Sequence, residues 1–203
     1  GSGVTYGGLK NTAIGYEAGG SGVFGGGSDG DGDANTLVGY AAGKAITTGL
    51  NNVIMGSAAG TVLTTGYSNV LLGKSAGANL TDNHDCIAIG HGALDGGNGG
   101  EAHNIAIGTN ALGADIAGSD YCVAIGGNAL ALQDANVVNT AIGGLAGDAI
   151  TSGDKNTYVG YLSGSASVGN GSNTAVGNMS YATGTGTSNI CIGTSAGNSL
   201  TGA

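Results

Sequence analysis

The residues best suited to chemistry gather between positions 84 and 103. They are His84, Asp85, Cys86, His91, Glu101 and His103, and they include every histidine of the chain. A transition metal needs three or four converging ligands. His91 lies five residues beyond Cys86 on an extended segment, roughly 16 Å away, so it cannot join them. We favour a surface ion pair between Asp85 and His103, and a metal site is the alternative.

A second set of possible ligands is acidic. Asp29, Asp31 and Asp33 alternate with other residues in the segment GGGSDGDGDAN, which resembles the start of a calcium loop. The closing acidic ligand, a Glu about twelve positions on, is missing. Calcium binding is therefore a hypothesis beside the favoured interpretation, a solvated acidic loop. We expect no other cofactor.

The rest of the sequence argues against catalysis and against polyanionic partners. No HExxH motif and no pair of acids with evident cleft geometry is present, so we expect no enzyme. The chain has 13 acidic residues, four lysines, no arginine and a net charge of −9, which repels nucleic acid and anionic membranes. The sequence contains no apolar run of 18 residues, so we predict no membrane insertion.

These residues are positioned by a five-residue motif that recurs eleven times. Its copies end at Gly15, Gly39, Gly56, Gly73, Gly90, Gly108, Gly126, Gly143, Gly160, Gly177 and Gly193. After a first gap of 24 residues, the spacing stays between 16 and 18. The second and fourth positions are mostly Ile, Val or Thr, which favour strands. Because residues two apart share a face of a strand, we predict that these two columns face a core.

Further columns predict how each turn closes. Three residues beyond each glycine lies Ala or Ser, usually followed by Gly at a corner that needs a positive φ. Segments such as AITTG at 45 and VLTTG at 62 predict a second short strand. Such units cannot bury an apolar face alone and must stack. We therefore predict an all-β parallel β-solenoid of about eleven 17-residue turns, with a lead-in at 1–10, one repeat domain at 11–203 and an acidic insertion at about 22–34.

Asparagine opens nine of the eleven copies. Stacked amides can hydrogen-bond from turn to turn, so the column predicts a structural asparagine ladder rather than a binding site. Its members are Asn11, Asn35, Asn52, Asn69, Asn104, Asn139, Asn156, Asn173 and Asn189. Cys86 and Cys122 take the same position two turns apart, roughly 9.6 Å, which is beyond disulfide reach. With Cys191 in another column, we expect three free, buried thiols.

The residues at the middle motif position predict an oligomer. It lies between the two columns assigned to the core, so we expect it to face outward. Its residues are uncharged: Ala13, Leu37, Ile54, Leu71, Ala88, Ala106, Ala124, Ala141, Tyr158, Ala175 and Cys191. An apolar stripe along the whole stack favours contact between identical chains. We therefore predict a homo-oligomer with this column at its interface.

The N-x-A-I-G core with Ala/Ser and Gly corners resembles the left-handed parallel β-roll heads of trimeric autotransporter adhesins. The repeat with its TTG-type spacer is also similar to NTAIG-rich arrays in marine phage tail fibres. The resemblance covers residues 11 to about 200. It implies left-handed coiling, a homotrimer, a virion or extracellular location, and a spacer or host-attachment role. The repeat is longer than that of the adhesin heads.

Three functions remain open at this point. A phage tail or virion fibre is the favoured one, with a host-surface receptor, for which a glycan is one candidate. A bacterial trimeric surface adhesin is the first alternative. An ice-binding solenoid is the second, and it is disfavoured because threonine fills the second motif position in only five copies and is expected to point inward.

Overall fold

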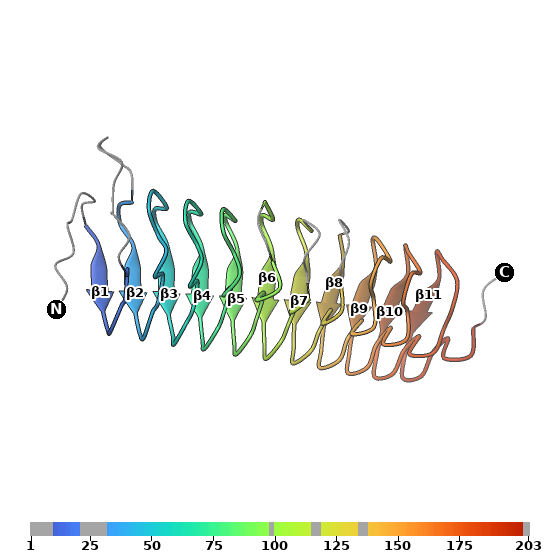
Figure 1. Cartoon of the computed structure of the whole chain (residues 1–203). Helices are drawn as coiled ribbons and strands as arrows, with labels where there is room; N and C mark the ends of the chain where they lie inside the picture. The colour runs from blue at the N-terminus through green and yellow to red at the C-terminus, as the bar shows by residue number, and fades with distance from the viewer. Residues whose placement is uncertain (1–9, 21–31, 98–99, 115–118, 134–137, 201–203) are drawn as a thin grey trace.

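The computed structural model describes residues 10–20, 32–97, 100–114, 119–133 and 138–200. Eleven short strands, one for each motif copy, lie in chain order in a single parallel sheet (Figure 1). They are β1 (Thr12–Ile14), β2 (Thr36–Val38), β3 (Val53–Met55), β4 (Val70–Leu72), β5 (Ile87–Ile89), β6 (Ile105–Ile107), β7 (Val123–Ile125), β8 (Thr140–Ile142), β9 (Thr157–Val159), β10 (Thr174–Val176) and β11 (Ile190–Ile192). The predicted all-β parallel solenoid is confirmed. Within the described residues, no helix is long and apolar enough to cross a membrane.

Neighbouring strands pair in register, so equivalent motif positions lie side by side along the stack. Leu37 pairs with Ile54, and Ala88 pairs with Ala106. Backbone hydrogen bonds extend this pairing beyond the strands: the Ile87 amide donates to the Asn104 carbonyl at 2.8 Å, and the Gly90 amide donates to the Leu72 carbonyl at 2.8 Å. Each motif position thus becomes a column that runs along the molecule.

The interior is lined by the middle residue of each strand. From β2 to β11 this residue is buried, whereas the first and last strand residues are partly or fully exposed. The prediction that the second and fourth motif positions face the core is therefore wrong. The remainder of each turn folds back over the face that carries the middle residue, and small side chains suit this narrow interior.

The second predicted strand is also absent from the described residues. In the TTG segments a few hydrogen bonds link neighbouring turns: the amides of Thr47 and Gly49 both donate to the Thr64 carbonyl, at 2.9 and 3.2 Å. The preceding corner residue is left-handed, as at Gly43 with φ 57°. This corner turns the chain sharply, so that too few consecutive residues stay extended to form a strand.

Beside the buried column of small Ala or Ser residues, three columns of varying side-chain size share the core volume in each turn: the middle strand residue and the residues six and nine positions later. The position six later carries a large side chain, as at Leu94, only where the middle residues of its own and the next strand are small, as at Ala88 and Ala106. The same holds for Leu112, Leu130 and Tyr181. Elsewhere this position is glycine, because a side chain there would collide with its neighbours. At Gly77, an added Cβ would lie 2.9 Å from Leu71.

The motif glycines bring the turns together. Their φ values lie between 122° and 147°, a region that is essentially restricted to glycine. A Cβ at Gly126 would also lie 2.5 Å from the carbonyl carbon of Gly143. The backbones of neighbouring turns therefore meet at this column with no space for a side chain.

The shared core volume predicts non-additive mutations at Leu71 and Gly77. Leu71→Ala leaves a cavity and should cost about 2–5 kcal/mol, and Gly77→Leu overpacks the core and should cost about 1–3 kcal/mol. In the double variant the contact with Leu71 is relieved and the new Leu fills part of the cavity, although its contact with Leu80 remains. The loss should therefore be smaller than the sum by about 0.5–3 kcal/mol. Denaturant unfolding of the four proteins measures this coupling. Simple additivity would contradict the shared volume.

The motif glycine column makes a second prediction, with an adjacent control. Gly126→Ala places a methyl group against Gly143 in a backbone conformation that alanine avoids, and should destabilise the fold by about 2–4 kcal/mol. At Gly127 the nearest atom to an added Cβ is 4.0 Å away, and the glycine has no positive φ. Gly127→Ala should therefore leave the melting temperature nearly unchanged. Equal melting temperatures for the two variants would argue against the close approach.

Candidate functional site

The asparagine column forms a buried hydrogen-bond ladder along the edge of the sheet where each strand begins. The Asn52 side-chain amide donates to Asn35 Oδ1 at 3.0 Å, and the Asn69 amide donates to Asn52 Oδ1 at 3.1 Å. The same oxygens also accept backbone N–H groups of the next turn, as Asn139 Oδ1 does from the Asn156 amide at 2.8 Å. These side chains are buried and engaged with the backbone, which is a structural arrangement.

Two cysteines interrupt this ladder, and a glutamine from another column compensates at one of them. Gln133 is buried, and its Nε2 contacts Cys122 Sγ at 3.0 Å while its Oε1 accepts from the Asn139 amide at 2.9 Å. All three cysteines are free and buried. Burial raises the pKa of the Cys86 thiol to about 12. Cys86 is therefore a small core residue and a poor nucleophile.

The middle column does not form the surface that the sequence suggested. Ala106, Leu37 and Tyr158 are fully buried within a single chain, so this column cannot be an interface between chains. Its members from β2 to β11 are Leu37, Ile54, Leu71, Ala88, Ala106, Ala124, Ala141, Tyr158, Ala175 and Cys191. The asparagine position could have revealed this, because it lies two residues before the middle position and shares its face.

The exposed surface of the sheet is formed by the first and last residue of every strand, which we call the outer sheet face. Its members are Thr12, Ile14, Thr36, Val38, Val53, Met55, Val70, Leu72, Ile87, Ile89, Ile105, Ile107, Val123, Ile125, Thr140, Ile142, Thr157, Val159, Thr174, Val176, Ile190 and Ile192. Five are threonine, and the others are Ile, Val, Leu or Met. On the inner strands the exposed fraction reaches 42% at Met55, and on the last strand it rises to 77% at Ile190. This face is long, regular and uncharged.

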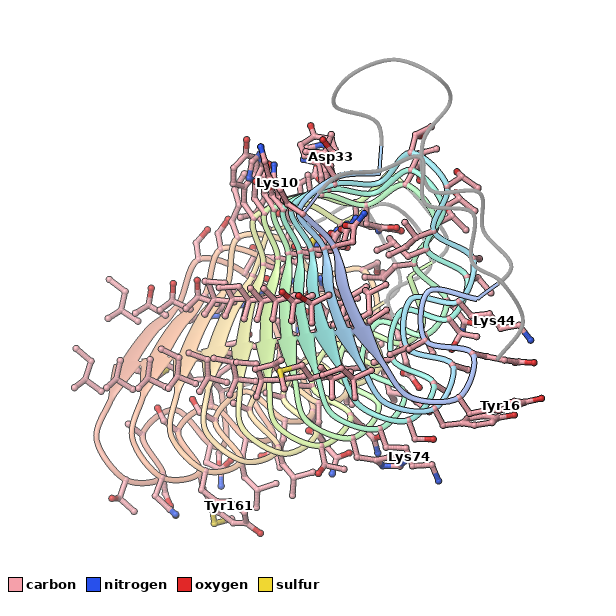
Figure 2. The ribbon with its side chains drawn as sticks, turned by 90° about the vertical axis from the view of Figure 1, so that its left-hand side faces the viewer. Lys10, Tyr16, Asp33, Lys44, Lys74 and Tyr161 are labelled. Carbon is pink, nitrogen blue, oxygen red and sulfur yellow. The ribbon has the colours of Figure 1, made fainter. Side chains whose placement is uncertain are left out.

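Charged and aromatic side chains flank the outer sheet face without interrupting it. Figure 2 shows rows of side chains projecting from the sheet, with Lys10 and Asp33 beyond one edge and Lys74 and Tyr161 beyond the other. The Tyr16 ring stacks on the ring of Tyr40 on the next turn, at 5.7 Å between centroids. The face thus has the apolar centre and polar rim of an interaction surface.

The acidic calcium candidates cannot be placed together. Asp29 and Asp31 lie outside the described residues. Asp33 lies just before the β2 motif, where its backbone carbonyl accepts the Asn51 amide at 3.0 Å. The calcium site remains a hypothesis.

Of the histidine-rich stretch, the structure brings three residues together at the surface. One ligand atom from each of His84, Asp85 and His103 lies within 4.8 Å of the others. Asp85 forms its ion pair with His84, at 3.0 Å, in place of the expected His103. Cys86 and Glu101 are buried, and Glu101 accepts a hydrogen bond from Asn83.

The described residues offer little for catalysis. Two copies of the repeat spell G-x-S-x-G, at 73–77 and 193–197, but Ser75 and Ser195 occupy left-handed corners with φ 57° and 56°. A nucleophile elbow needs a following helix, and a turn follows here. A recess near the C-terminal end is lined by Ser195, Gly197, Asn198, Ser199 and Leu200, none of which is an acid, base or metal ligand.

Comparisons with protein-family models, with curated proteins and with solved structures find no match for this chain.

Proposed function

We propose that this chain is a structural or adhesive subunit of an extracellular or virion fibre, in which identical chains pack against one another through the outer sheet face. The stack of eleven strands supplies a rigid rod, roughly 50 Å long at about 4.8 Å per strand. A rod of this kind suits a spacer that holds an attachment site away from a surface.

The observation that carries the proposal is the apolar outer sheet face. Its area, about 50 Å by 10 Å, approaches the largest apolar patches of soluble monomers. It carries no charge on any strand, although the chain has a net charge of −9. A face of this length that only met water would gain nothing by excluding charged residues. Covering it with a second copy would remove it from water.

The finer assignment follows from resemblance. Similarity to the NTAIG-rich arrays of phage tail fibres supports a left-handed homotrimer in a phage tail or virion fibre, used as a spacer or for host attachment. A bacterial trimeric surface adhesin is the alternative within the same class. Tyr16, Tyr40 and Tyr161 are exposed and offer aromatic rings to a receptor such as a glycan.

A charge on the outer sheet face tests the assembly. Ile142→Asp should dissociate the oligomer, because burying an unpaired carboxylate at an interface costs several kcal/mol. The matched control is Leu132→Asp, which places the same charge on an exposed leucine outside the strands and should leave assembly unchanged. Light scattering gives the molecular mass, and circular dichroism checks that both variants fold.

Two outcomes would contradict assembly through this face. One is a wild-type chain that stays monomeric at high concentration. The other is an Ile142→Asp variant that keeps the wild-type mass.

Ice binding is a second candidate, and the orientation of the strand threonines favours it. Thr140, Thr157 and Thr174 begin three consecutive strands and face outward. The prediction that threonine at the second motif position points inward, which disfavoured ice binding, is therefore wrong. Side chains on the outer sheet face repeat at about 4.8 Å across strands and about 6.6 Å along them. Ice binding needs a regular array of this type.

Thermal hysteresis separates the two functions. A fibre subunit should show none, because its outer sheet face is covered by other copies. An ice-binding chain should show hysteresis that Thr157→Lys abolishes and that Leu132→Lys retains. Hysteresis with this pattern would replace the fibre assignment.

A further inference from the structure

The three surface ligands near β5 and β6 lie on adjacent turns at one edge of the sheet. His84 and Asp85 precede the β5 motif, and His103 precedes the β6 motif by one residue. The turns are tied together here: His84 and Ala102 form a parallel bridge, and the His103 amide donates to the His84 carbonyl at 3.3 Å. The backbone therefore fixes the separation of the two imidazoles.

Aromatic stacking then fixes how the two imidazoles are oriented. Tyr67 stacks on His84 at 4.6 Å with an interplanar angle of 4°, and Tyr121 stacks on His103 at 4.7 Å and 19°. The two imidazoles meet edge-on, at 86° and 5.6 Å between centroids. Because tyrosines cover the outer faces of the pair, the rings have few alternative orientations. Their nitrogens and the Asp85 carboxylate can converge on one point.

The donor set indicates which ligand suits this place. Two imidazole nitrogens and one carboxylate oxygen are typical ligands of zinc and of other first-row divalent ions, with a further position left for water. Calcium and magnesium favour all-oxygen sites. The ligand atoms lie within 4.8 Å of one another. The longest distance between two of them must shorten by about 1 Å for an ion to lie about 2.0–2.2 Å from each. The side chains of His84 and Asp85 are 30% and 42% exposed, which leaves room for that adjustment.

The local charge also favours a cation. Asp85, Glu101 and Asp120 all act electrostatically on the neighbouring Cys86 thiol. The four lysines are at positions 10, 44, 74 and 155, none of them within this stretch of sequence.

We propose that His84, Asp85 and His103 form a binding site for a first-row divalent transition metal ion, with zinc as its test ligand. The ion would link the two turns that carry β5 and β6. This site is distinct from the acidic calcium candidate and does not depend on the proposed fibre function.

The test is zinc titration of the full chain by isothermal titration calorimetry, after chelator treatment and dialysis. The wild-type chain should bind one Zn²⁺ per chain. His103→Ala and Asp85→Asn should each weaken binding by about tenfold or more, since even partners outside the ligand shell change metal affinity about 10–100-fold. His91→Ala is the matched control, because His91 is exposed and follows β5 at its opposite end; it should bind like the wild type.

Two further measurements distinguish the loss of a metal ligand from misfolding of a variant. Excess zinc should raise the melting temperature of the wild type and of His91→Ala, and not that of His103→Ala. Bound Co²⁺ should give visible absorption bands that Asp85→Asn alters while circular dichroism stays unchanged. Absence of zinc binding by the wild type, undiminished binding by both site variants, or loss of binding in His91→Ala would each overturn the proposal.

Discussion

The close approach of neighbouring turns at the motif glycines is the constraint on which the rest of the structure depends. At Gly126 and its equivalents, the backbone of one turn meets the carbonyl of the next where a Cβ would stand. Contact this close holds the turns at strand-pairing distance along the whole sheet and allows one register. Every other position of the repeat is thereby forced into a column whose members touch only their equivalents and near neighbours.

Because the core is built from such columns, the side-chain volumes within each turn must match locally. A turn has one narrow interior, so a large residue at one core position requires glycine or alanine at another, as Leu71 does with Gly77 and Leu94 with Ala88. Buried polar groups are shared between turns in the same way: the Asn52 side chain hydrogen-bonds within its own turn and to both neighbouring turns. Gln133 supplies an amide where Cys122 lacks one. The repeat tolerates sequence change when a neighbouring column compensates.

The same geometry produces an unusual exterior. Each strand is short and presents two side chains outward, so eleven strands give two parallel rows rather than a broad sheet surface. Within the described residues, charged side chains lie outside the strands, most of them at least partly exposed and Glu101 buried, and the two rows remain apolar or threonine. One edge of this surface also brings His84 and His103 together, which only stacking of consecutive turns could do, because the two residues belong to separate copies of the repeat.

By itself the sequence determined the repeat, the strand in each copy, the parallel stacking, the asparagine column and the free cysteines, because each depends on spacing and local preference. The apolar pattern of a three-residue strand did not settle which face lies inside, since Ala106 and its neighbours Ile105 and Ile107 are all compatible with a core. Only the asparagine two residues earlier indicated the inner face. That choice belongs to the tertiary structure: the left-handed corners fold each turn over the face that carries the asparagine and the middle residue. The convergence of His84, Asp85 and His103 was likewise decided by ring stacking between turns, because the orientation of a side chain depends on neighbours that a linear pattern does not place.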